Sequence, residues 1–363
     1  MRVSYRIFSW LLSVVAPALL VLAGAAAQPA AAQGVSFKGK QVNWVVNQAA
    51  GGMGDLIIRE LGPFIEKHLP GQPKIIFRNK GGGRFKSGAI YLFRDVKNDG
   101  MTAGHVSVIF ADWSLGAKMP INLEDFRYTG SRACNQLVIV RQKAGLKSMA
   151  DLLNAKKPIV GGHHTLYSVV PVALRVFLEM VGAPAKHVAG YRGGMAAFKA
   201  MHSDEVDLGI LNSDVYQQRE ANLKKDGVIA AIAQLGIIKG GKMTREKGIN
   251  LPTLQEIVEK HAPKHVGTAT YKAWISVMGS MALCQVYALP PGTPDKFVEV
   301  WKKAVEDAYG DSGYTAIRAK RNMGPAIFIP GNATDKLVKG YAKQRVSPAF
   351  RKFWAKYGPP KKN

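Results

Sequence analysis

The chain has 363 residues, of which 47% are hydrophobic and 21% are charged. This composition excludes a disordered chain, a collagen-like chain and a small disulfide scaffold, and it is too rich in charge for a protein with many membrane spans. Lys and Arg number 50 against 25 Asp and Glu, which gives a net charge of +25. Such a balance favours nucleic acid, an anionic membrane surface or anionic ligands as partners.

The N-terminus has the pattern of an export signal. Two arginines precede an apolar stretch from Phe8 to about Gly24, and an Ala-rich segment follows. We expect a cleavable signal peptide over residues 1–32, cut near Ala32, and a periplasmic mature protein that does not meet nucleic acid. The alternative is a permanent membrane anchor, which Pro17 and the lack of a stop-transfer flank disfavour.

Beyond the signal, short β-branched runs alternate with amphipathic helical stretches. This alternation predicts parallel or mixed α/β sheets, and about 330 mature residues are too many for one core, so we expect two domains. The stretch 236–248 is the most loop-like interior segment. The predicted strands are 41–47, 74–78, 137–141, 158–161, 208–211 and 228–235, and the predicted helices are 55–68, 169–181, 195–202, 295–308 and 334–341.

The sequence carries no common catalytic or nucleotide-binding motif. Zinc-protease, Cys-x-x-Cys, nucleophile-elbow and P-loop patterns are all missing, and the acidic residues are dispersed. We therefore predict a protein that is not an enzyme and that has no cofactor and no metal site. His163 and His164 are adjacent with no third ligand at a fixed spacing, so a metal site is weakly supported. The remaining interpretations are a polar cleft lining or ordinary loop histidines.

Two glycine-containing turns each join a strand to a helix. The first spans 47–55 and the second spans 162–168. Small residues at such a turn leave the helix N-terminal amides open to an anion. Two such turns, one in each domain, would hold the two ends of a dicarboxylate. The alternative is that both are plain strand-to-helix connections.

A series of short motifs resembles the Bug-type periplasmic solute-binding proteins of tripartite tricarboxylate transporters. Each motif is weak alone, but their order along almost the whole mature chain is specific. The matching segments are 37–42 (FKGKQV), 51–55 with Arg59, 69–73 (LPGQP), 78–83 (RNKGGG), 98–102 (NDGMT), 191–194 (YRGG), 205–207 (EVD), 251–256 (LPTLQE) and 289–294 (LPPGTP).

The resemblance implies a Venus-flytrap fold of two α/β domains joined by two crossover strands. Domain I would comprise 34–130 and 286–363, and domain II would comprise 131–285. The protein would be a monomer that binds a small carboxylate and meets the large and small membrane subunits of a transporter. The implied ligand-binding residues are Asn47, Gln48, Ala49, Gly51, Gly52, Asp55, Gly82, Gly83, Gly162, His163, His164, Thr165, Ser168, Tyr191, Arg192 and Gly193.

Three of these side chains have an alternative interpretation. Asp55 lies in the first turn of a helix, where a carboxylate caps free amides, and we favour that role over contact with a ligand ammonium or water. Tyr191 is also compatible with an amphipathic surface ring. Arg192 either contacts a ligand carboxylate or contributes to a solvated basic face.

Cys134 and Cys284 are the only cysteines. In the layout that the resemblance implies, they lie on the two neighbouring crossover strands, so a disulfide is compatible with the strand spacing. Two separately buried free thiols are the alternative that we favour, because free cysteine is among the most buried residues.

These observations together predict a periplasmic receptor that captures a small di- or monocarboxylate and delivers it to a membrane transporter. Two other interpretations stay open: a secreted hydrolase or isomerase on a similar two-lobed scaffold, and a ligand receptor that feeds a signalling partner.

Overall fold

The computed structural model describes residues 34–107, 109–191 and 194–360. The predicted signal peptide lies outside these ranges, as do Arg192 and Gly193. Within them, every helix is too short or too polar to cross a membrane.

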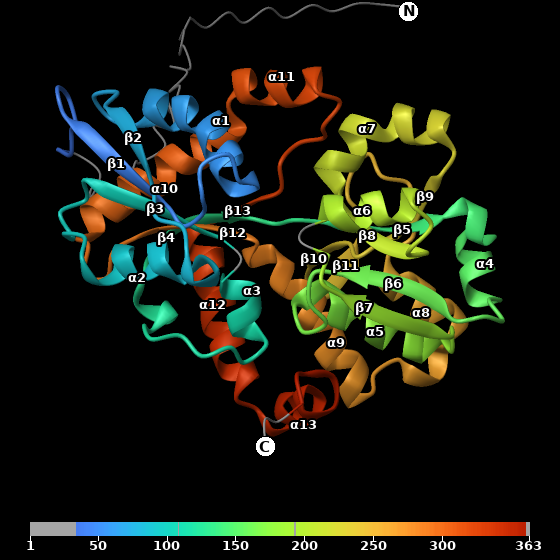
Figure 1. Ribbon diagram of the computed structural model, residues 1–363. Coiled ribbons are helices and arrows are strands. Elements are labelled where there is room, and N and C mark those ends of the chain that lie inside the picture. Colours follow the sequence, from blue (N-terminus) through green and yellow to red (C-terminus); the bar gives the residue numbers. More distant parts are fainter. Residues whose placement is uncertain (1–33, 108, 192–193, 361–363) are drawn as a thin grey trace, which may run out of the picture.

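Two β-sheets form the centres of two lobes, which lie side by side (Figure 1). The first lobe has a six-stranded sheet in the order β13-β4-β12-β3-β1-β2, and the second has a five-stranded sheet in the order β7-β6-β8-β5-β9. The first lobe contains β1 (Gln41–Val46), α1 (Met53–His68), β2 (Lys74–Asn79), α2 (Lys86–Arg94), β3 (Thr102–Ser107), α3 (Ile109–Ser114), β4 (Arg127–Arg132), β12 (Gln285–Leu289), α10 (Asp295–Gly310), α11 (Ser312–Lys320), β13 (Phe328–Pro330) and α12 (Gly331–Arg345).

The second lobe is built from the middle of the chain and from the last helix. It contains β5 (Gln136–Arg141), α4 (Met149–Leu153), β6 (Ile159–His163), α5 (Val169–Val181), β7 (Ala185–Ala189), α6 (Gly194–His202), β8 (Leu208–Asn212), α7 (Ser213–Asp226), β9 (Ile229–Gln234), the hairpin β10 (Ile237–Lys239) and β11 (Lys242–Thr244), α8 (Leu254–His261), α9 (Ala269–Gly279) and α13 (Pro348–Tyr357).

Parallel pairing sets the direction in which each lobe presents its loops. Strand β1 pairs in parallel with β2 and β3, and β6 pairs in parallel with β7 and β8. The loops that follow these strands therefore emerge at the carboxyl edge of each sheet, where ligands bind in open α/β sheets.

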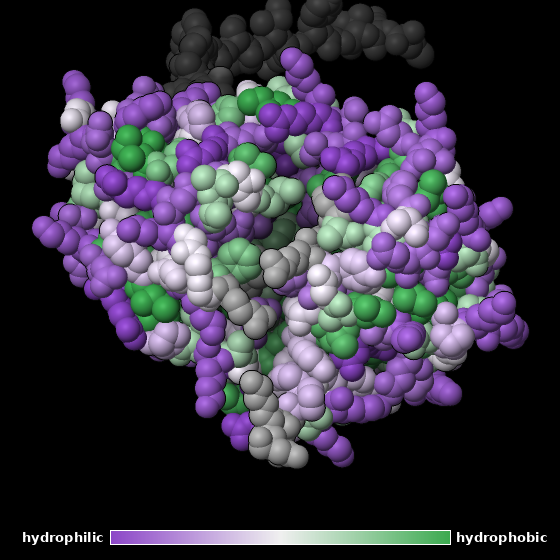
Figure 2. Space-filling view, in the orientation of Figure 1, coloured by the Kyte–Doolittle hydropathy of each residue, from purple (hydrophilic) through white to green (hydrophobic). Residues whose placement is uncertain are grey.

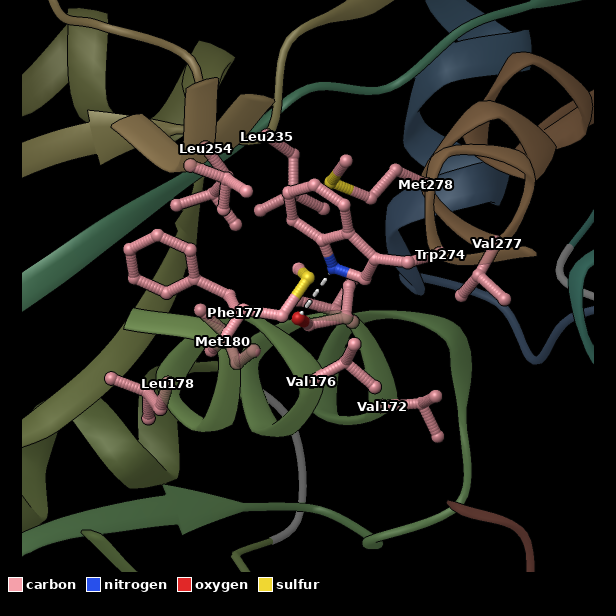
Figure 3. Packing of buried hydrophobic residues seen from close by; sticks show 14 of the residues in the cluster. Val172, Val176, Phe177, Leu178, Met180, Leu235, Leu254, Trp274, Val277 and Met278 are labelled. Carbon is pink, nitrogen blue, oxygen red and sulfur yellow. Dashed lines mark hydrogen bonds between the residues drawn. The ribbon is translucent and has the colours of Figure 1, made fainter. Parts of the chain in front are cut away.

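Each lobe has its own apolar core. In the first, Trp44 packs edge-on against Trp301 and Tyr287, with ring centroids 5.7 and 5.9 Å apart. In the second, Trp274 of α9 lies among apolar side chains of α5 and donates its indole N–H to the carbonyl of Ala173 at 2.8 Å (Figure 3). The nearly uniform apolar sequence of α5 follows from its burial on most sides.

The last helix departs from the expected domain layout. Phe350, Phe353 and Tyr357 of α13 belong to the core of the second lobe, and α13 packs against α9. The division into 34–130 with 286–363 and 131–285 stays a prediction, and this packing favours placing α13 with the second lobe.

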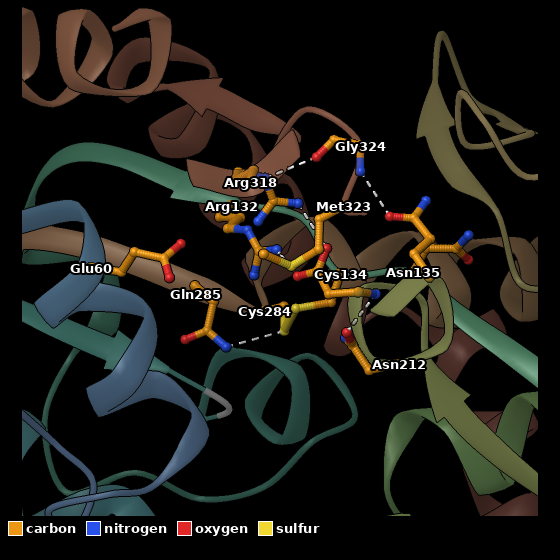
Figure 4. A network of polar contacts seen from close by, with 12 residues as sticks. Glu60, Arg132, Cys134, Asn135, Asn212, Cys284, Gln285, Arg318, Met323 and Gly324 are labelled. Atoms are coloured by element: carbon orange, nitrogen blue, oxygen red, sulfur yellow. Dashed lines mark hydrogen bonds and ion pairs between the residues drawn. A yellow bond between two sulfur atoms is a disulfide. The ribbon is translucent and has the colours of Figure 1, made fainter. Parts of the chain in front are cut away.

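The hinge lies where two crossover strands pass between the sheets. Residues 133–135 connect β4 to β5, and Cys284 leads into β12. A disulfide joins Cys134 to Cys284, with the Cα atoms 5.7 Å apart (Figure 4). The structure thus has the bridged form and not the two free thiols that we favoured from the sequence. The bridge fastens the two crossover strands to each other at the pivot.

Candidate functional site

The turn after β1 is held by its own buried side chains. Asn47 donates its side-chain amide to the carbonyl of Phe85 at 3.0 Å, and Gln48 accepts from the amide of Gly54 at 2.8 Å. Both residues are buried, whereas Ala49 and Gly51 are exposed. These bonds fix the backbone of the turn relative to α1 and to the loop before α2.

Asp55 is engaged within the first lobe. Its carboxylate accepts from the amide of Gly51 at 2.9 Å, from Arg59 Nε at 2.9 Å and from the side-chain amide of Asn79 at 2.8 Å. Burial raises the pKa of Asp55, but the bonds from Arg59, Asn79 and Gly51 lower the pKa more, so the net shift is downward. The carboxylate accepts from one backbone amide, that of Gly51 in the turn before α1, so Asp55 fastens this turn to the helix.

Three predicted glycines of the first lobe are needed for different reasons, either a backbone conformation that favours glycine or a lack of space for a side chain. Gly82 and Gly83 have φ of +109° and +55°, a conformation that favours glycine. Gly52 has an ordinary φ of −67°, but a Cβ there would lie 3.1 Å from the carbonyl oxygen of Ala49. A side chain at position 52 is thus limited by space and not by backbone conformation.

His163 faces the interior of the second lobe. Its side chain is buried, and its Nε2 lies 2.9 Å from Nδ1 of His187. Burial, together with the nearby charges of His187 and Arg175, lowers the pKa of His163 to about 3. The ring is neutral between pH 6 and 8, so it supplies no pH-dependent charge to a ligand there. His164 is exposed, and Gly162 is buried against Val206 and Tyr191.

Tyr191 is half-buried and donates its hydroxyl to Glu205 at 3.4 Å. Burial and the carboxylate of Glu205 raise the pKa of Tyr191. Its predicted neighbours Arg192 and Gly193 lie outside the described residues.

A cavity of about 330 Å³ lies between the lobes. Figure 2 shows a furrow between them, with apolar surface visible in its depth. Of the predicted residues, Thr165 and Ser168 line this cavity, while the described residues of the 47–55 turn, Gly82 and Gly83 are not part of its wall. The wall consists of Lys86, Ile109, Asp112, Leu115, Gly116, Ala117 and Met119 from the first lobe and of Thr165, Tyr167, Ser168, Trp354 and Pro359 from the second.

Lys86 and the N-terminus of α5 each contribute positive character to the wall of the cavity. Lys86 Nζ donates to the carbonyl of Lys118 at 3.0 Å, and an ammonium group has two further protons to donate. Ser168 is the N-cap residue of α5, yet its hydroxyl makes no capping bond. The first amides of this 13-residue helix have no intrahelical acceptor, so they favour an anion.

A larger cavity of about 650 Å³ lies away from this region, on the outer face of the first lobe. It is lined by α10, His68 and the start of α12, and none of the predicted site residues belongs to it. Its mixture of Lys302, Glu306 and Asp307 gives no net preference for an anion. In the described ranges, no three His, Cys, Asp or Glu side chains are placed to hold a metal ion.

Two sheets joined by two crossover strands define the fold of the two-domain periplasmic binding proteins. Three solved structures that share it are a TctC solute binding protein from Polaromonas (18% identity, TM-score 0.63, 88% of this chain and 100% of that chain), an R. palustris protein with adipate (20%, 0.61, 88% and 97%) and MatC from Rhodopseudomonas palustris with bound malate (17%, 0.56, 84% and 97%). No protein-family profile matches the sequence, and no curated protein matches it. The likeness confirms the predicted α/β fold with two crossover strands.

Proposed function

We propose that the protein is a periplasmic solute-binding receptor that captures a small organic acid between its lobes. The observation that carries this proposal is the 330 Å³ cavity, whose walls come from both lobes and include Lys86 and Ser168, the N-cap residue of α5. The neighbouring structures with adipate and malate support a carboxylate as the ligand class. The turns at 47–55 and 162–168 form the rims of the same furrow in this proposal.

Binding stabilises the closed form in this mechanism, because the ligand contacts both lobes at once only when they approach each other. The covalently joined crossover strands at Cys134 and Cys284 act as the pivot. The loaded monomer then delivers the acid to the large and small membrane subunits of a tripartite transporter. Reconstituted uptake that depends on this protein tests that delivery step, and binding without any partner-dependent uptake favours the signalling alternative.

A thermal-shift screen of the purified mature protein tests ligand capture. An acid at 100 times its Kd should add about 2.7 kcal/mol to the free energy of unfolding. Lys86→Gln should reduce the shift, whereas Lys339→Gln, which removes an exposed charge paired with Asp335, should not. If no carboxylate, sulfonate or phosphate in a broad panel raises the melting temperature of the wild type, the proposed function is wrong.

A further inference from the structure

The protein carries far more positive charge than its ligand cavity uses. Lys and Arg outnumber Asp and Glu by 50 to 25, but Lys86 is the single basic residue among the described residues that line the cavity between the lobes. About a quarter of the surplus lies near the end of the chain, where residues 331–360 contain seven Lys or Arg residues and one acidic residue, Asp335. This segment forms α12 and α13, and its charge favours an anionic partner.

Helix α12 has its buried and basic side chains on opposite faces. The buried side chains are Thr334, Val338 and Tyr341, and the exposed basic ones are Lys336, Lys339 and Lys343. With about 3.6 residues per turn, these two sets lie on opposite sides of the helix. Arg345 is the exception, because its guanidinium lies 4.9 Å from the ring centroid of Trp113 and thus faces the first lobe.

Helix α13 is divided in the same way. Its aromatic side chains Phe350, Phe353 and Tyr357 belong to the core of the second lobe. Its basic side chains Arg351, Lys352 and Lys356 are all exposed. The two helices therefore both present basic side chains on the faces that are turned away from the cores.

Acidic side chains border these helices at positions away from the junction between them. Toward the start of α12, Asp335 pairs with Lys339 at 2.7 Å, and both line a cavity with Glu124 and Asp125. In the last turn of α13, Glu179 pairs with Lys356. The charge of Glu124 also acts on Arg345. These contacts compensate basic residues along the two helices, but not those on either side of the junction.

Val346 and Ser347 form the corner between α12 and α13, at the lower end of the molecule (Figure 1). The side chain of Val346 is 51% exposed. With a rise of about 1.5 Å per residue, Lys343, Arg351 and Lys352 all lie within about 10 Å of this corner. In the ranges that the structure describes, these three cations have no acidic partner. We call Lys343, Val346, Arg351 and Lys352 the basic corner.

We propose that the basic corner is a docking surface for an anionic phospholipid bilayer. Basic side chains near such a surface are each attracted to it, and the attraction extends over about a Debye length. The three cations are carried by two helices and flank an exposed apolar side chain at a convex corner, which suits a flat charged layer with an apolar interior. The inference does not depend on which acid binds between the lobes. Docking would hold the receptor at the membrane surface.

Cosedimentation with lipid vesicles tests the docking. The mature protein should bind phosphatidylcholine vesicles that contain phosphatidylglycerol and should not bind vesicles of phosphatidylcholine alone. Binding should fall at least tenfold between about 0.1 M and about 1 M NaCl, because the Debye length shrinks from about 10 Å to about 3 Å. No binding to the anionic vesicles, or equal binding to both kinds, would overturn the inference. An acidic protein surface would then be the alternative partner of this face.

Charge variants separate the basic corner from the general charge of the protein. The triple variant Lys343→Gln/Arg351→Gln/Lys352→Gln should weaken vesicle binding at least tenfold, because each cation near the bilayer contributes about fivefold. Exchange of these residues for the other basic type (Lys343→Arg/Arg351→Lys/Lys352→Arg) should preserve binding. The matched control is Lys40→Gln/Lys156→Gln/Lys157→Gln, which removes three exposed lysines from the segments before β1 and β6. Equal weakening by the two glutamine variants would overturn the assignment to the corner.

A fluorescent label tests the orientation of the docked protein. Both native cysteines are in the disulfide, so a cysteine added by Val346→Cys is the single free thiol. An environment-sensitive dye at position 346 should become brighter when anionic vesicles are added. The same dye at Ala221→Cys, an exposed position in α7 at the opposite end of the molecule in Figure 1, should not. An equal or larger increase at position 221 would overturn docking through the basic corner.

Discussion

Arg132 and Asp214 form an ion pair that joins the two lobes beside the hinge. Arg132 ends β4 in the first lobe, and Asp214 lies in the first turn of α7 in the second. Arg318 of α11 adds a second bond to the same carboxylate at 2.8 Å. The three side chains are at most 15% exposed, so the pair is shielded from solvent.

Asp214→Asn should destabilise the protein strongly. Removal of one partner of a buried pair leaves an unpaired charge and costs about 3–5 kcal/mol. Urea unfolding at pH 7 measures the change in the free energy of unfolding. Asp335→Asn, which removes an exposed partner of Lys339, is the control and should cost less than about 1 kcal/mol. Equal effects of the two variants would contradict a structural role for the hinge pair.

Much of the fold was predictable because its central elements have clear periodicity. Strands β1 and β5 are rich in the β-branched residues Val and Ile, and helices such as α1 and α10 bury one face of a regular apolar pattern. Several elements were missed, including the 11-residue α9 and the 14-residue α7, whose mostly polar sequence buries only Ser213 and Leu223 and so has no clear apolar face. Strand β3 contains Gly104 and the buried His105, which break the apolar alternation, and the segment 236–248, predicted as a loop, contains the hairpin β10–β11.

The candidate site was less predictable than the fold. The strand-to-helix turns after β1 and β6 lie where the sequence predicts them, and their role in binding stays a prediction. Sequence spacing does not determine the direction in which adjacent side chains point. Consecutive residues at a strand end face opposite ways, so His163 enters the core whereas His164 is exposed. Lys86 of α2 and Trp354 of α13 line the same cavity only because the two lobes face each other there, and no local pattern in the sequence signals this.

The disulfide should contribute about 5 kcal/mol to the free energy of unfolding, because it closes a loop of 150 residues in the unfolded chain. The double variant Cys134→Ser/Cys284→Ser should unfold at a lower urea concentration than the oxidised wild type. Reduction of the wild type should bring it to the same midpoint, and reductant should leave the double variant unchanged. Thiol titration of the denatured, unreduced protein should find no free thiol. Two free thiols per chain would contradict the bridge.

The buried histidines should make the protein less stable in acid. The pKa of His163 is about 3 in the folded state against about 6.5 in the unfolded chain, so only the unfolded chain gains a proton between these values. The contribution of His163 to the free energy of unfolding is therefore fully present above pH 6.5, and it is lost as the pH falls below that value. For this site the loss between pH 7 and pH 5 should be about 2 kcal/mol.

His163→Gln tests this linkage, because glutamine fills a similar volume and does not titrate. Its unfolding free energy should change less between pH 7 and pH 5 than that of the wild type. His164→Gln, at the neighbouring exposed position, is the control and should keep the wild-type dependence. An identical pH dependence in His163→Gln and the wild type would show that His163 is protonated in the folded protein.

Gly88→Ala should disturb the turn after β1, because the glycine lies in α2 directly beneath it. A Cβ at this position would lie 2.6 Å from Asn47 Cα and 2.8 Å from the carbonyl oxygen of Lys80. Both are backbone atoms, so the clash is relieved only by moving the turn, at a cost of about 1–3 kcal/mol. Gly340→Ala in α12 is a matched control, since no atom other than those of its chain neighbours and its own helix backbone lies within 4 Å of the added Cβ. There, helix propensity alone should stabilise by up to about 1 kcal/mol. In urea unfolding, Gly88→Ala should lower the free energy of unfolding and Gly340→Ala should raise it. A Gly88→Ala protein that is more stable than the wild type would mean that α2 does not support the turn.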